Sequence, residues 1–216
     1  MRDFPFFTTE YGVSGLVLKE IPYKETAYIQ IRDVQNEYFG ENLAECVSFC
    51  RMCGAERIYA AGHEMLEKYP LYTEVIQMRG TVSEDGQKVK SLFPVTQKTV
   101  SQWRTIYNKR MGGVDNAATL ESRDEKRILE SGGAYFVHED GKVLGIGWLE
   151  DNRILAIAAV EKGAGEAVMH TLLSLIREES AIVEVASTNM AAIRLYEKLG
   201  FVKTALIASW YRVWPV

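Results

Sequence analysis

The sequence predicts an α/β protein of the α+β type, in which a central, mixed and mostly antiparallel sheet is flanked by helices. Three observations predict this class. Residues 134–149 have the pattern of two strands joined by a tight turn, and residues 154–186 have the pattern of a strand, a glycine turn, a helix and a strand. A weaker copy of the second pattern occurs in the first part of the chain. We therefore expect two tandem halves, with an N-terminal half at 1–80, a linker at 81–91 and a C-terminal domain at 92–216.

The C-terminal half carries the stronger pattern. Glu139-Asp140-Gly141 separates two apolar segments and predicts the turn of a hairpin. The run Ile154–Val160 is apolar without alternation, which predicts a strand buried on both faces. A helix is expected from the glycine turn to about Glu179. Further strands are expected at 181–186 and within 201–213, and further helices at 101–110, 123–129 and 189–199, the last capped by Asn189 and ended by Gly200.

The N-terminal half repeats this order with less detail. Strands are expected at 26–31, 57–61 and 74–78, and a helix at 39–53. At an offset of 125 residues, Gly40-Glu41 falls on Gly165-Glu166 and Ile58 falls on Val183; at an offset of 130, Glu67-Lys68 falls on Glu197-Lys198 and Val75 on Ala205. The ordered agreement of element types favours an internal repeat. Few identities are involved, so chance agreement is the alternative.

The composition excludes several classes of protein. The 216 residues are 47% hydrophobic and 25% charged, which are globular values that exclude a disordered or collagen-like chain. The formal net charge of −4 gives no overall positive field for nucleic acid or anionic lipid. No apolar run approaches the ~18 residues of a membrane span, and the segment Met1–Pro5 lacks a signal-peptide pattern. We therefore expect a cytoplasmic protein that binds neither nucleic acid nor membrane.

The three cysteines, Cys46, Cys50 and Cys53, have a spacing that places them on one face of a helix. An odd number without a secretion signal argues against a disulfide framework. A metal site would need a fourth ligand, for which His63 is the nearest candidate. Because cysteine is among the most buried residue types, we expect a stripe that faces the core and no metal.

The glycine turn between a buried strand and a helix is a candidate anion site. Gly163 and Gly165 would let a phosphate approach the free N–H groups at the helix start, and Lys162 adds a cation. The alternative is that the tight turn needs glycine for steric reasons alone. A P-loop is excluded because no Gly-Lys-Ser/Thr follows, and a dinucleotide fingerprint fails at Val168.

Two motifs resemble those of the GNAT acyltransferase superfamily. Lys162-Gly-Ala-Gly-Glu-Ala167 resembles the (Arg/Gln)-x-x-Gly-x-(Gly/Ala) loop, with lysine in place of the usual arginine or glutamine. Asn189-Met-Ala-Ala-Ile-Arg-Leu-Tyr-Glu-Lys-Leu-Gly-Phe201 resembles the Asn-x-x-Ala-x-x-x-Tyr-x-x-x-Gly-Phe signature in full. Together they cover 154–201, and the order of strands extends the likeness over 92–216. The N-terminal half resembles a degenerate copy, because Val34–Gly40 holds one glycine and no basic residue.

The resemblance implies a GNAT fold and acetyl-CoA as co-substrate. It implies that Ile157 and Ala159 pair with the pantetheine and that the amide of Ile157 polarises the thioester carbonyl. Tyr196 matches the acid that protonates the leaving thiolate, and Asn189 either contacts CoA or only caps its helix. Glu150 and Asp151 are candidate bases for the attacking amine, although a solvated turn is the alternative for both. The pyrophosphate would bind the backbone of one segment: Lys162, Gly163, Ala164, Gly165, Glu166 and Ala167.

The resemblance therefore predicts an N-acetyltransferase that transfers acetyl from acetyl-CoA to an amine by direct attack in a ternary complex. The acceptor is expected to be a small molecule or a peptide, and the protein a monomer or homodimer. The alternative is a non-catalytic acyl-CoA-binding or regulatory module. Lys162 and the absence of a clear base favour that alternative, whereas the tyrosine at position 196 favours the enzyme.

Overall fold

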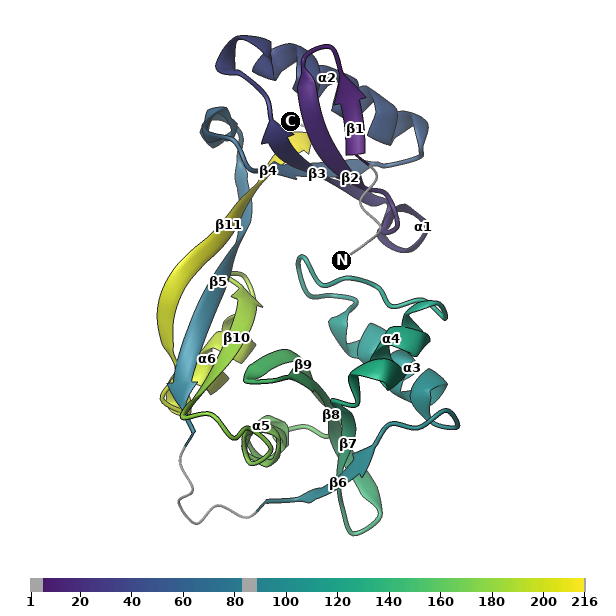
Figure 1. The fold of residues 1–216 in the computed structure, drawn as a ribbon, viewed down its shortest axis with the longest axis vertical. Coiled ribbons are helices and arrows are strands. Elements are labelled where there is room, and N and C mark those ends of the chain that lie inside the picture. Colours follow the sequence, from purple (N-terminus) through teal and green to yellow (C-terminus); the bar gives the residue numbers. More distant parts are fainter. Residues whose placement is uncertain (1–5, 83–88, 216) are drawn as a thin grey trace. The chain divides into compact units, whose positions relative to one another are not determined.

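The computed structural model describes residues 6–82 and 89–215 (Figure 1). They divide into two units. Unit 1 holds the residues up to Glu74 together with those from Leu206 onward, and unit 2 holds Val75–Ala205. These bounds differ from the expected 1–80 and 92–216, because two long strands, β5 (Leu71–Thr81) and β11 (Val202–Trp214), each have one end in each unit. Most of the expected linker at 81–91, residues 83–88, lies outside the described residues.

The sheet of unit 2 is mixed and mostly antiparallel, as predicted. Its strands lie in the order β5-β10-β9-β8-β7-β6, and only β9 and β10 pair in parallel. The strands are β6 (Ser91–Pro94), β7 (Ala134–Glu139), β8 (Lys142–Glu150), β9 (Arg153–Ala159) and β10 (Ser180–Ala186). The turn between β7 and β8 falls at Asp140 and Gly141, both of which have positive φ.

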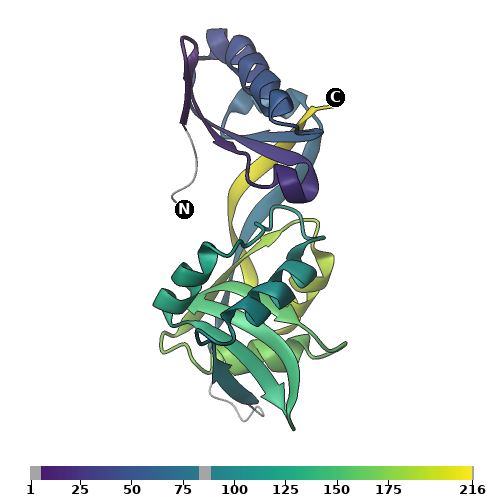
Figure 2. The ribbon, with the colours of Figure 1, turned by 90° about the vertical axis from the view of Figure 1, so that its right-hand side faces the viewer.

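Two pairs of helices bury opposite faces of this sheet (Figures 1 and 2). One apolar cluster joins α3 (Val100–Met111) and α4 (Asp124–Ser131) to inward residues of β7, β8 and β9. Another joins α5 (Gly165–Leu173) and α6 (Met190–Lys198) to β9, β10 and β5. The helix expected to reach Glu179 ends earlier, because Leu175 and Ile176 continue in tighter turns onto the carbonyls of Leu172 and Leu173.

The prediction that β9 is buried on both faces is confirmed except at Leu155. Ile154 and Ile157 pack in the cluster of α5 and α6, and Ala156 and Ala158 pack in the cluster of α3 and α4. Ile154 is 5% exposed, whereas the neighbouring Leu155 is 39% exposed. A register shift on the β8 side lies between the pairs Trp148↔Ala156 and Leu149↔Ile154. On its other side, β9 pairs with β10 at only two positions, so Leu155 has no neighbouring strand to cover it. The apolar composition therefore reflects packing on both faces of the sheet, with Leu155 as the exposed exception.

The sheet of unit 1 has the order β1-β2-β3-β4-β11 and packs against one long helix, α2 (Phe39–Met52). Cys46 and Cys50 lie on the buried face of α2, as predicted. Cys53 is exposed, because the helix has already ended at Met52. The remaining elements of unit 1 are β1 (Phe6–Thr9), β2 (Gly12–Val17), α1 (Ile21–Lys24), β3 (Thr26–Asp33), η1 (Asn36–Tyr38), β4 (Arg57–Ala61) and η2 (Glu64–Lys68).

Strands β5 and β11 are exchanged between the two halves of the sequence. By sequence, β5 follows β4 in the N-terminal half, yet its residues Val75–Thr81 pair with β10 of the C-terminal half. Likewise, β11 ends the C-terminal half, yet Tyr211, Arg212 and Trp214 pair with β4. Each unit is therefore completed by a strand from the other half. In the part of the chain that the structure describes, no helix has the length and hydropathy of a membrane span.

Candidate functional site

The glycine turn opens directly into α5. Gly163 has a φ of +84°, and a Cβ placed there would meet nothing within 4 Å, so the turn lies open on this side. Gly165 is the first helical residue, and no side chain caps the helix start. The first N–H groups of α5 therefore face outward at the positive end of the helix dipole. This is a backbone site for a phosphate group.

Charged side chains surround the turn. Lys162 is exposed beside the two glycines. The carboxylate of Glu166, in the first turn of α5, is bound by Lys198 of α6, and its hydrogen bond to Lys198 lowers the pKa of Glu166. Arg110, at the end of α3, donates from Nη2 to the carbonyl oxygen of Val160, where the turn begins. Sequence reasoning missed Arg110, because it lies 50 residues before Val160 and belongs to no motif.

Strands β9 and β10 separate next to this turn. Their parallel pairing covers Ile182↔Arg153 and Val183↔Ile154 and then stops. On the other side, Val160 N–H donates to the Leu144 carbonyl at 2.7 Å. Bonded and non-bonded pairs alternate along an antiparallel ladder, so Gly145↔Ala159 and Gly147↔Ile157 are non-bonded pairs. The N–H groups of Ile157 and Ala159 therefore point away from β8, into the fork between β9 and β10.

Helix α6 carries Tyr196 into the same apolar cluster as Ile157 and Ala164. The ring is 5% exposed, and burial raises the pKa of Tyr196 to about 12. The helix is fixed at both ends. Asn189 Oδ1 accepts from the Ala192 N–H at 3.2 Å, so it caps the helix as predicted. At the other end, Gly200 has a φ of +81° and its neighbour Phe201 donates to the Tyr196 carbonyl at 2.9 Å, which is a Schellman motif.

These features coincide with a family match. Residues 100–201 match the model of the acetyltransferase (GNAT) family. Residues 100–201 are a GNAT acetyltransferase domain. The matched segment contains the glycine turn, the fork and α6. The comparison with curated proteins gives no match.

Solved structures show the same fold as the whole chain. A GCN5-related N-acetyltransferase from Sphaerobacter thermophilus has a TM-score of 0.60 at 10% identity, covering 95% of this chain and 78% of that one. A GNAT-family acetyltransferase from Colwellia psychrerythraea has a TM-score of 0.53 at 12% identity, covering 96% and 84%. A tandem GNAT protein from the clavulanic acid biosynthesis pathway has a TM-score of 0.53 at 11% identity, covering 95% and 80%. The fold is thus consistent with two GNAT-like halves.

The structure does not bring Glu150 and Asp151 to the fork of this GNAT domain. Both lie at the β8–β9 turn, and β9 runs from Arg153 to Ile157 over about 13 Å at ~3.3 Å per residue. Glu150 lies 3.6 Å from Arg127 Nη2, and Asp151 is exposed with a φ of +53°. Direct proton transfer from an amine at Ile157 to either carboxylate is therefore out of reach.

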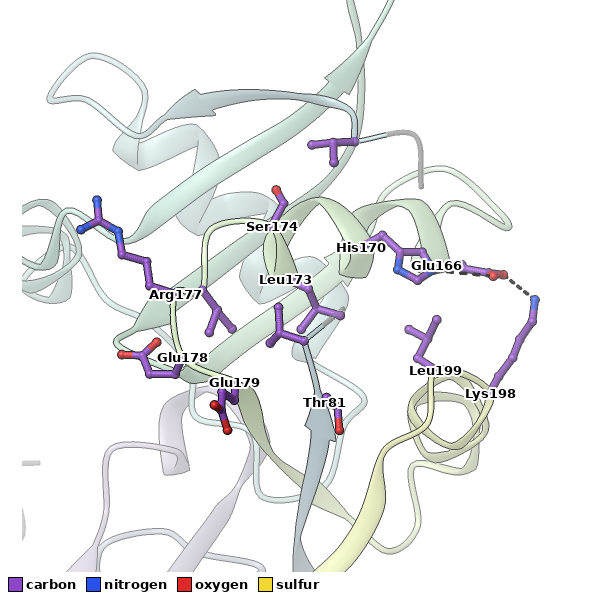
Figure 3. A pocket seen from close by; sticks show the side chains of 13 residues that line it. Thr81, Glu166, His170, Leu173, Ser174, Arg177, Glu178, Glu179, Lys198 and Leu199 are labelled. Carbon is purple, nitrogen blue, oxygen red and sulfur yellow. Dashed lines mark hydrogen bonds and ion pairs between the residues drawn. The ribbon is translucent and has the colours of Figure 1, made fainter. Parts of the chain in front are cut away.

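A cavity of about 920 Å³ lies along α5, with the end of β5 and residues 176–179 among its lining (Figure 3). Glu166, His170 and Lys198 lie at one end of it, and Arg177 and Glu179 lie at the other. His170 Nε2 is 3.9 Å from Glu166 Oε1, so the ion pair with Lys198 extends into a small polar cluster. The cavity begins at the first turn of α5, because Glu166 belongs to both.

Proposed function

We propose that this chain is an enzyme that transfers an acetyl group from acetyl-CoA to an amine by direct attack in a ternary complex. The observation that carries the proposal is the fork between β9 and β10 beside an open glycine turn and an uncapped helix start. The turn can receive a pyrophosphate, and the fork offers unpaired strand edge for an amide-containing chain such as pantetheine.

In the proposed site, backbone N–H groups bind the cofactor and one side-chain hydroxyl assists release of the thiolate. The N–H groups of Lys162–Ala167 bind the pyrophosphate, with Lys162 and Arg110 as nearby cations. Ile157 and Ala159 pair with the pantetheine, and the Ile157 N–H donates to the thioester oxygen as negative charge develops there. The amine nitrogen bonds to the carbonyl carbon, the carbon–sulfur bond breaks, and one proton leaves the nitrogen and neutralises the CoA thiolate. The hydroxyl of Tyr196 donates a hydrogen bond to the departing sulfur.

We further propose that the N-terminal half is a degenerate GNAT-like half without a cofactor site. Strands β3 and β4 are its counterparts of β9 and β10, and they pair at five successive positions, from Thr26↔Arg57 to Gln30↔Ala61. No fork exists along that stretch. The helix that follows β3 begins at Phe39, which is fully buried, where the C-terminal half has its open glycine turn. One chain is therefore proposed to bind one acetyl-CoA.

A non-catalytic acyl-CoA-binding module is the second candidate. Two observations favour it: the distance of Glu150 and Asp151 from the fork, and the pKa of about 12 at Tyr196, which makes that phenol a weak proton donor. Both candidates require acetyl-CoA to bind at the glycine turn. Only the enzyme releases free CoA when an amine is added.

A thermal-shift titration with acetyl-CoA tests the shared requirement. A ligand that binds only the folded state stabilises it by ~2.7 kcal/mol at a hundredfold excess over its Kd. We expect a shift in the wild type that is lost in Gly165→Glu, whose carboxylate would repel the pyrophosphate. Gly40→Glu is the matched control, because Gly40 is the counterpart of Gly165 in the repeat and a Cβ there meets nothing within 4 Å.

Release of free CoA in the presence of amines then separates the two candidates. Turnover supports the enzyme, and binding without turnover of any amine supports the module. A wild type that shows no shift at millimolar acetyl-CoA would contradict both.

A further inference from the structure

On the face of the unit 2 sheet opposite α5 and α6, helices α3 and α4 cover apolar residues of β7, β8 and β9, whereas β5, β10 and the start of β9 carry polar side chains. Val183 of β10 and its partners Met78 of β5 and Ile154 of β9 all pack in the cluster beneath α5 and α6. Side chains alternate along a strand, so their neighbours lie on the opposite face. These neighbours are Ile182 and Glu184 of β10, Gln77 and Arg79 of β5, and Arg153 of β9.

The strand register arranges these side chains in two rows. Arg79, Ile182 and Arg153 form one row, because Ile182 is the partner of both arginines. Gln77 and Glu184 form the next row. The two arginines are about 10 Å apart at their backbones, since neighbouring strands are ~4.8 Å apart. Along the strands, the backbones of the two rows are about 7 Å apart, which is two residues of strand rise.

The polar groups on this face are held by contacts that a ligand can replace. Arg153 Nη2 donates to Glu184 Oε1, and the two side chains are 45% and 39% exposed. Exposed ion pairs of this kind contribute little to stability. Arg79 Nη1 donates to Ser180 Oγ at 3.4 Å, and Thr204 donates to Gln77 Oε1 at 3.2 Å. Both arginines are therefore available to a carboxylate, which an arginine fork binds with two hydrogen bonds.

Glu184 lies where the fork begins. The last β9–β10 pair is Val183↔Ile154, so Glu184 is the first residue of β10 beyond the pairing. Ile157, the proposed donor to the thioester oxygen, lies a short way along the other branch. Because α5 and α6 cover the opposite face, an acceptor reaches the fork from the face that carries Glu184.

We propose that this face binds the acceptor and that the acceptor is an amine that also carries a carboxylate, about 7 Å from its nitrogen. This inference rests on the proposed acetyl transfer. Arg79 and Arg153 hold the carboxylate, and Glu184 holds the ammonium group. One ammonium proton passes to Glu184 and the nitrogen bonds to the acetyl carbon. The carbon–sulfur bond then breaks, and the second proton leaves the nitrogen for the departing CoA sulfur, so that the products are the amide and the CoA thiol. Two positive groups and one negative group on the protein match one carboxylate and one ammonium on the acceptor.

A pair of acceptors that differ only in the carboxylate tests this proposal. With acetyl-CoA, the wild type should use 6-aminohexanoate at least tenfold better in kcat/KM than hexylamine. Arg79→Gln should raise the KM for 6-aminohexanoate about tenfold and the KM for hexylamine less than threefold. Arg153→Gln should raise the KM for 6-aminohexanoate by a similar factor and should also change kcat for both acceptors, because Arg153 contacts Glu184. Glu184→Gln should lower kcat for both. Arg123→Gln, which also removes an exposed arginine from a pair with a glutamate, is the control and should change neither acceptor.

A second measurement does not depend on turnover. Calorimetry should detect binding of 6-aminohexanoate to the complex with CoA, and Arg79→Gln or Arg153→Gln should weaken that binding about tenfold. Equal use of the two acceptors by the wild type, or an equal rise in KM for both acceptors in Arg79→Gln, would overturn the proposal. Absence of 6-aminohexanoate binding would overturn it too. In each case, an acetyl-CoA thermal shift that persists shows that the cofactor site is intact, so the two failures are distinguishable.

Discussion

Replacing Tyr196 by phenylalanine isolates one hydroxyl of the proposed site. The ring is 5% exposed and lies 5.9 Å from the ring of Phe201, and both rings stay in place in the variant. Among the described residues, none forms a hydrogen bond with the Tyr196 hydroxyl, and that oxygen is not one of the buried polar atoms left without a partner. We therefore expect the free energy of unfolding of Tyr196→Phe at neutral pH to stay within about 0.5 kcal/mol of the wild type.

The expected effect on the rate follows from the pKa of the phenol. Burial raises the pKa of Tyr196 to about 12, whereas a free thiol has a pKa of ~8.5. Full proton transfer to the CoA thiolate is then uphill by about 5 kcal/mol. The hydroxyl is expected to stabilise the thiolate by a hydrogen bond to a charged group, which is worth about 1.5–3 kcal/mol. Its loss should lower kcat about 10- to 150-fold and leave the Kd for acetyl-CoA nearly unchanged.

The pH dependence of stability gives a second readout of the same hydroxyl. The pKa in the folded state, about 12, lies above the unfolded value of 10. The stability that depends on neutral Tyr196 is therefore fully present below pH 10 and is lost as the pH rises through 12. At pH 11 this loss amounts to about 1.4 kcal/mol in the wild type and is absent from the variant. Burial also raises the pKa of Cys50 to about 12. Because Cys50 is present in the wild type and in the variant, its contribution cancels in the comparison.

The assays are CoA release at saturating acetyl-CoA and urea unfolding at pH 8 and pH 11. Tyr135→Phe is the matched control, because Tyr135 is a partly buried tyrosine packed against the same cluster. A kcat within twofold of the wild type would refute the role of the Tyr196 hydroxyl in releasing the thiolate. If the wild type and Tyr196→Phe lose the same free energy of unfolding between pH 8 and pH 11, the argument that the Tyr196 hydroxyl is desolvated is refuted.

Three further predictions follow from the geometry. Calorimetry should give one acetyl-CoA per chain, and a value of two would contradict the proposal that the continuous pairing of β3 with β4 closes the N-terminal half. Asn189→Ala should lower the free energy of unfolding by about 1 kcal/mol through loss of the helix cap, with less than a threefold change in the Kd for acetyl-CoA; a tenfold change would assign Asn189 to the cofactor instead. Gly80→Ala should cost about 1–3 kcal/mol in urea unfolding, because its Cβ would lie 2.4 Å from the Phe201 ring; Gly113→Ala, with nothing within 4 Å, is the control.

Features that depend on neighbouring residues in the chain could be predicted from the sequence. The hairpin at Asp140-Gly141 forms as expected, because the pair supplies the two positive φ values that the turn needs. Helix α6 begins after Asn189 and ends before Gly200, since its cap and its terminating glycine are local hydrogen-bonding devices. The glycine turn, the family of the C-terminal domain and the mixed sheet followed from the same kind of local signal.

Features that depend on distant partners could not be predicted. Arg110 reaches Val160 only because α3 packs on the sheet beside β9. The exposure of Leu155 results from the fork, and nothing in the apolar run itself marks where β10 departs. Glu150 and Asp151 are near the apolar strand in sequence, which is why they are candidate bases. They lie before its first residue, at the end of the strand away from the glycine turn.

The exchange of β5 and β11 makes the N-terminal half necessary to the C-terminal sheet, whether or not that half binds a cofactor. A domain limited to 92–216 lacks β5, so the β10 edge that pairs with Val75–Thr81 would be left open. The same strand supplies Gln77 and Arg79 to the proposed acceptor face. Selection on the acceptor would then act on residues of the N-terminal half, even though the proposed cofactor site belongs to the C-terminal one. The two halves can diverge in their loops. Loss of β5 would remove a strand from the sheet that holds β10, and loss of β11 would remove a strand from the sheet that holds β4.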